Sequence, residues 1–269
     1  MHYLIGSQPL LTRLRLGVGV YTLGELYNNP ARYILSEKTI TTLSFNCPLD
    51  SHVWPESLLR RLQTLEVALN GFDGGDHLCW SMVQKSVALL TLHVNIHFPS
   101  APLISHPSCR NLVIVHCDAI CSVEEVRMPR LQGLTIVASG PNAFMRLTLV
   151  DTPVSSLRLI CKTRQFEEIS PAERASWVGG AIRLLRSTPR LERLEICAPG
   201  WVVVGISEAI AEDSNLCMEL NTFTFRIDLT PGIWQEVEGH AKDDEAILEQ
   251  LKIKIFSHIN QRRLCQTKN

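Results

Sequence analysis

Residues 188–196 read Thr188-Pro189-Arg190-Leu191-Glu192-Arg193-Leu194-Glu195-Ile196, and this stretch decides the fold. Its Thr-Pro pair predicts the end of a helix and a turn, because proline cannot continue a helix. The apolar residues Leu191, Leu194 and Ile196 then follow the spacing L-x-x-L-x-L. The last two lie two residues apart, so on a strand they point to the same face, and the residues between them point to the other.

The same spacing occurs nine times, centred on residues 14, 43, 65, 92, 112, 134, 157, 194 and 223. Between residues 43 and 157 the centres are 20–27 residues apart, which agrees with the period of about 20–29 residues in leucine-rich repeats. One unit cannot bury its own apolar face, whereas units stacked in parallel share a continuous core. The spacing therefore predicts an α/β leucine-rich-repeat solenoid over residues 1–230. We expect a curved parallel sheet on its concave side and helices and irregular segments on its convex side.

Several segments between the predicted strands have helical features. Ser170-Pro171-Ala172-Glu173 forms a capping box with proline at the first helical position. It predicts a helix ending before Pro189, with one apolar face. That face consists of Ala175, Val178, Ala181, Ile182 and Leu185. Shorter helices are expected over residues 54–60 and 79–90, and residues 144–149 predict a short strand on the convex side.

The repeat fades after residue 230. Residues 231–269 predict a helical cap within the same domain, because a terminal repeat needs its open end covered. The apolar positions of the expected capping helix recur four residues apart, at Ile247, Leu251, Ile255 and Ile259.

Composition narrows the classes of partner. The 269 residues carry a formal net charge of −1, so the basic footprint of a nucleic-acid-binding protein is not evident. No apolar run reaches the roughly 20 residues of a membrane span, and the N-terminus does not resemble a signal peptide. The odd number of cysteines, nine, favours reduced thiols in the cytoplasm or nucleus over a secreted disulfide scaffold. We expect a protein partner, and neither nucleic acid nor a membrane.

The candidate binding residues are the polar ones that alternate with the apolar strand positions. Such side chains would face the concave surface, along which repeat solenoids bind their partners. The strongest candidates are charged or titratable: Arg13, Arg15, Glu66, His93, Arg158, Arg193, Glu195 and Arg226.

Two alternatives remain open beside a protein-binding module. One is a metal-dependent or hydrolytic enzyme that uses the His/Cys-rich region from His93 to Cys121, because imidazole and thiolate groups are zinc ligands. The spacings there only approach those of structural zinc sites, and the expected register turns Cys109 and Cys117 inward, away from His93. We therefore predict no metal, no cofactor and no catalytic residue. The other alternative is a truncated fragment without activity.

The sequence resembles the irregular leucine-rich-repeat proteins of the fungal F-box type. The likeness lies in residues 184–196, where a helix ends in Ser-Thr-Pro before Leu-Glu-Arg-Leu, and in residues 129–136. The resemblance implies the substrate-binding part of a ubiquitin-ligase adaptor, in which an F-box docks the linker subunit of a cullin ligase. Too few residues precede Leu11 for the helices of an F-box, so that linker is an expected partner only if an F-box lies upstream.

Overall fold

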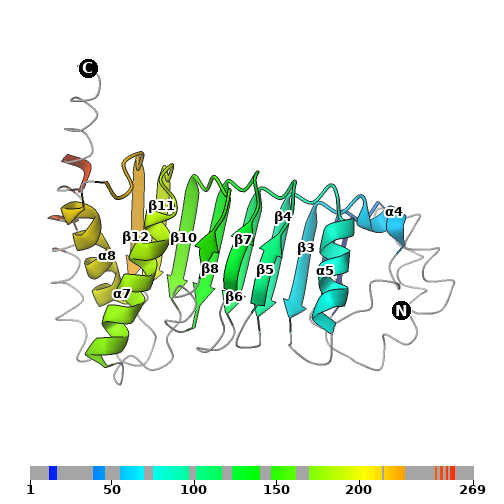
Figure 1. Ribbon diagram of the computed structural model, residues 1–269, viewed down its shortest axis with the longest axis horizontal. Coiled ribbons are helices and arrows are strands. Elements are labelled where there is room, and N and C mark those ends of the chain that lie inside the picture. The colour runs from blue at the N-terminus through cyan, green and yellow to red at the C-terminus, as the bar shows by residue number, and fades with distance from the viewer. Residues whose placement is uncertain are drawn as a thin grey trace, which may run out of the picture.

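The architecture is that of a mixed α/β protein with a large parallel sheet. The computed structural model describes residues 12–16, 39–45, 55–69, 75–96, 101–116, 123–139, 147–161, 170–213 and 215–227, together with helical residues 246, 249, 250, 253 and 255–257. Within these ranges nine strands form one sheet and three form another. Figure 1 shows the large sheet extending along the long axis of the molecule, with its strands running across that axis.

All nine strands of the large sheet are parallel, and they follow one another in chain order. They are β1 (Arg13–Leu16), β2 (Thr42–Phe45), β3 (Thr64–Leu69), β4 (Thr91–Ile96), β6 (Asn111–His116), β8 (Gly133–Ala138), β10 (Ser156–Cys161), β11 (Arg193–Ala198) and β12 (Thr222–Ile227). The central apolar residue of each predicted unit pairs with that of the next, from Leu14 to Phe223. The predicted strand register is confirmed.

The backbone repeats the same contact at every step between these strands. The carbonyl two residues before each central position accepts two successive N–H groups of the following unit. The Gln132 carbonyl, for example, accepts the N–H groups of Ser155 and Ser156 at 3.0 and 2.9 Å. These shared carbonyls satisfy the backbone N–H groups at the start of each strand, before the regular hydrogen bonds of the sheet.

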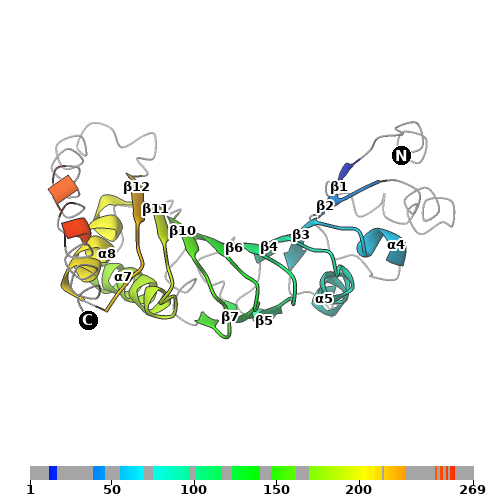
Figure 2. The same cartoon turned by 90° about the horizontal axis from the view of Figure 1, so that it is seen from above.

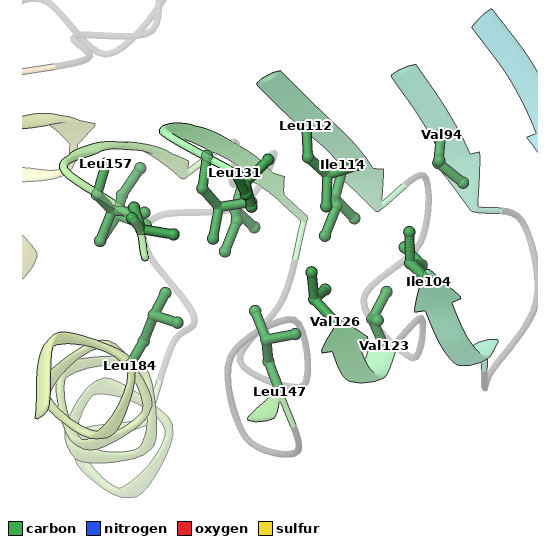
Figure 3. Packing of buried hydrophobic residues seen from close by; sticks show 14 of the residues in the cluster. Val94, Ile104, Leu112, Ile114, Val123, Val126, Leu131, Leu147, Leu157 and Leu184 are labelled. Atoms are coloured by element: carbon green, nitrogen blue, oxygen red, sulfur yellow. The ribbon is translucent and has the colours of Figure 1, made fainter. Parts of the chain in front are cut away.

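The core lies between the large sheet and a second layer. The central positions from Leu14 to Phe223 are at most 8% exposed. Figure 3 shows Val94, Leu112, Ile114 and Leu157 pointing toward residues of the second layer. The labelled residues on that side are Ile104, Val123, Val126, Leu147 and Leu184.

The second layer changes from helix to strand and back along the chain. It consists of α4 (Glu56–Leu59), α5 (Gly75–Lys85), the small parallel sheet of β5 (Ala101–Ser105), β7 (Val123–Arg127) and β9 (Thr148–Leu149), then α7 (Pro171–Arg186) and α8 (Gly200–Glu212). Seen from above, the large sheet bends into an arc, and this layer covers its convex side (Figure 2). The short strand expected within residues 144–149 is present as β9. Strands β5 and β7 and helix α8 were not predicted.

The capping box of α7 is present as predicted, but the buried face of the helix differs. Ser170 Oγ accepts the N–H of Glu173 at 3.3 Å, and the Glu173 carboxylate accepts the N–H of Ser170 at 2.9 Å. Trp177 and Leu184 join the core, whereas Ala175 is exposed. Val178, which was expected in the buried face, lies against Gly205 of the neighbouring helix α8. A methyl group added to Gly205 of α8 would come within 2.9 Å of the Val178 side chain, so glycine permits the close approach.

The expected C-terminal cap falls mostly outside the described residues. Ile247, Leu251 and Ile259 lie outside them. Ile255 is helical and 1% exposed, and it belongs to the core cluster, whereas Ile253 is 69% exposed. None of the described helices combines the length and apolar character needed to cross a membrane.

Candidate functional site

The candidate site is the concave face of the large sheet, opposite the core; we call it the outer face. Side chains on a strand alternate between two faces, so the buried central residues place their neighbours on this one. The burial of β4 and β6 shows the alternation, with core positions fully covered and intervening ones accessible. In-register pairing lines the intervening residues up in rows across the strands.

All eight candidate residues belong to these rows. One row runs from Arg13 on β1 to Arg193 on β11 and ends at Thr222. The middle row begins at Arg15. It continues through Ser44, Glu66, His93, Val113, Thr135, Arg158, Glu195 and Thr224. Arg226 on β12 belongs to a third row.

Glu66 is the centre of a polar cluster near the N-terminal end of the sheet. Ser44 Oγ donates a hydrogen bond to its Oε2 at 2.6 Å, and Asn95 Nδ2 donates to its Oε1 at 3.4 Å. His93 lies opposite Glu66 on the adjacent strand. Burial lowers the pKa of His93, and the negative charge of Glu66 opposes that shift. The carboxylate is thus already held by side chains of β2 and β4.

A second charged pair lies toward the other end. Arg158 Nε approaches Glu195 Oε1 at 3.2 Å, across adjacent strands and in register. Both side chains are partly exposed, so the pair adds little stability. The carboxylate of Glu195 is therefore already paired with a positive charge on the same face.

Four further arginines at the ends of the outer face are exposed: Arg13, Arg15, Arg193 and Arg226. Among the described residues, these four form no ion pair. The structure therefore brings together Glu66 with His93 and Arg158 with Glu195. It keeps Arg13 and Arg15 of β1 at the opposite end of the sheet from Arg226 of β12.

Sequence reasoning missed an apolar patch that begins beyond the Glu66 cluster and extends alongside the Arg158–Glu195 pair. The patch lies on β6, β8, β10 and β11 and consists of Val113, Val115, Val137, Ile160 and Cys197. Val137 is 8% exposed, yet it is not part of the core cluster. The other members are half-buried. The signal was present in the run Leu112-Val113-Ile114-Val115, where outward positions carry valine although a solvated sheet face favours polar residues.

The His/Cys-rich region does not converge on one point in the part of the chain that the structure describes. His97, Cys117 and Cys121 lie outside the described residues. His93 lies on the outer face, whereas Cys109 is a core residue. Among described residues, no group of three or more His, Cys, Asp or Glu side chains could hold a metal ion. Cys109 Sγ donates to the Asn111 carbonyl at 3.1 Å, and burial raises the pKa of its thiol to about 11.

His106 has a packing role in the same region. It is fully buried, and its Nδ1 accepts the N–H groups of Ser108 and Cys109 at 3.3 and 3.2 Å. Burial lowers the pKa of His106, and the backbone carbonyls of Ser86 and Val83 raise it in part. A ring that accepts at Nδ1 carries its proton on Nε2 when neutral. This histidine therefore stabilises the turn before β6 beside the end of α5.

Comparison with known proteins yields no family for this chain. No protein-family model matches the sequence, and no curated protein matches it. The function must therefore be inferred from the geometry of the outer face.

Proposed function

We propose that the chain is a leucine-rich-repeat solenoid and a non-enzymatic protein-binding module that holds its partner on the outer face. The nine in-register units and their shared carbonyls support the repeat assignment. The observation that carries the binding proposal is the apolar patch. Protein interfaces combine a less charged centre with a polar rim, and the outer face has this arrangement.

The narrower form of the proposal follows from the resemblance to F-box proteins. In that form the module is the substrate-binding part of a ubiquitin-ligase adaptor, and its partner is the substrate to be modified. Co-purification of the cullin-ligase linker subunit with the protein from its native cells tests this form separately.

Site-specific photocrosslinking tests the binding proposal. A benzophenone side chain replaces Thr135, which pairs with Val113 of the apolar patch. In a second protein it replaces Arg183, which is exposed on α7. After irradiation in an extract of the native cells, we expect a discrete crosslinked partner from position 135 and none from position 183. The same partner crosslinked equally from both positions, or from neither, would contradict the proposal.

A matched pair of substitutions checks that the apolar patch itself holds the partner. Val115→Asp places a charge in the patch, whereas Val87→Asp places it at a valine that is 60% exposed and lies outside the sheet strands. We expect crosslinking from position 135 to be lost with the first substitution and kept with the second. Circular dichroism confirms that both variants fold.

A further inference from the structure

Building on the proposed function, we propose that the partner segment is acidic at both ends and apolar in the middle. The charged groups of the outer face support this inference. Its glutamates already have side-chain partners on the face, whereas most of its arginines remain available to bind a carboxylate. Of the two glutamates, Glu66 is held by Ser44 and Asn95, and Glu195 is paired with Arg158. The arginines Arg13, Arg15, Arg193 and Arg226 have no such ion pair within the described residues.

The positions of the available arginines set the length of the segment. Two are on β1 and the other two are on β11 and β12, and the apolar patch extends from β6 to β11, over the part of this span next to the second pair. From β1 to β11 there are seven strand-to-strand steps, about 34 Å at about 4.8 Å each. An extended peptide covers that span with about ten residues. We therefore expect acidic side chains about ten residues apart, with aliphatic residues between them.

The chemistry of the face favours a peptide over a nucleic acid. Single-stranded nucleic acids are bound by positive grooves in which aromatic side chains stack on the bases. Of the three outward rows on the described strands, none includes Phe, Tyr or Trp. Branched aliphatic side chains between the arginines suit an aliphatic partner segment instead.

Fluorescence anisotropy with three labelled probes tests the inference. The first probe is a 12-residue peptide with two Glu at each end and Val and Leu in the middle. The second has Lys in place of every Glu, and the third is a 12-nucleotide single-stranded RNA. We expect the full chain to bind the acidic peptide at least about tenfold more tightly than either other probe, with an affinity that falls as salt is added.

A charge-reversed variant connects binding to the arginines. Arg193→Glu together with Arg226→Glu should weaken binding of the acidic peptide at least about tenfold. Arg190→Glu, an exposed arginine in the turn before β11, should leave it unchanged. The inference is overturned by equal binding of the basic peptide or the RNA, or by an unchanged affinity in the double variant. It is also overturned if the chain forms a dimer that the double variant abolishes, because a second copy would then be the occupant.

The outcomes separate this inference from the proposed function. If a cellular partner crosslinks to position 135 but the acidic peptide does not bind, the binding module stands and the acidic character of its partner is wrong. If no partner depends on the patch, both proposals fall.

Discussion

Leu134→Ala is the sharpest test of the strand register, because Leu134 and Thr135 are adjacent on β8 and point to opposite faces. Leu134 is 1% exposed and lies between Leu112 and Leu157 of the neighbouring strands. Truncation of a fully buried leucine costs the lost transfer free energy plus that of the cavity, about 3 kcal/mol. Thr135 faces outward on a central strand, so Thr135→Ala should change the free energy of unfolding by less than about 1 kcal/mol.

Denaturant unfolding followed by circular dichroism measures both variants. Because proteins can unfold locally, hydrogen exchange of the β8 peptides serves as a second measurement. The matched control is Leu103→Ala, the same change at a leucine of β5 that is 40% exposed, and it should cost clearly less. Equal losses from Leu134→Ala and Thr135→Ala would refute the reasoning, because a slip of one residue in register exchanges the two faces.

Two further predictions concern titratable side chains, some on the outer face of the large sheet and some in the core. Among the cysteines whose burial the structure describes, alkylation by iodoacetamide at pH 8, mapped by mass spectrometry, should modify half-buried Cys197 well before the three buried ones. At pKa about 11 the thiolate fraction of Cys109 is about a hundredfold below that at the ordinary value of 9.0, and burial also raises the pKa of the others. The buried thiols are Cys109, Cys161 and Cys217. Glu66→Gln should lower the pKa of His93 further in an NMR titration, since the carboxylate now opposes the effect of burial. Because the folded state holds this proton less tightly than the unfolded chain, the His93 contribution reduces stability as pH falls below about 6.5. A rise in the pKa of the variant would contradict the reasoning.

The core of the large sheet could be predicted because each unit obeys one local rule. A residue such as Leu65 or Leu92 is buried whatever its unit packs against, since the alternation of a strand alone fixes its face. The eight candidate residues could be placed on the outer face for the same reason. Their pairing could not be predicted, because Arg158 and Glu195 meet only through the register of separate strands.

The second layer could not be predicted to the same extent, because its local signals conflict with its structure. Strand β5 contains Pro102, which argues against a strand but is tolerated at the edge position that β5 occupies in the small sheet. Strand β7 buries Val123 and Val126, three residues apart, so its pattern does not alternate. Helix α8 begins after Pro199 without a side-chain cap and contains three successive valines. Contacts with α7 and the sheet override these weak helical preferences.

The switch between helices and strands in the second layer explains both the irregular spacing of the units and the curvature of the outer face. Three steps of 20–23 residues bring β5, β7 and β9 into the second layer, and a fourth step of 22 residues brings the four-residue helix α4. The longer steps of 27, 29 and 37 residues bring α5, α8 and α7. A helix is about 10 Å wide and adjacent strands are about 4.8 Å apart, so helices spread their side of the structure and bend the sheet away from them. Where strands face strands the two layers match in width and little bending is required, which agrees with the shallow middle of the arc in Figure 2. The apolar patch thus begins on β6 and β8, where strands face strands, and continues to β11, while the available arginines lie on β1, β11 and β12. A partner segment that extends from β1 to β11 and crosses the patch would meet positive charge at both of its ends.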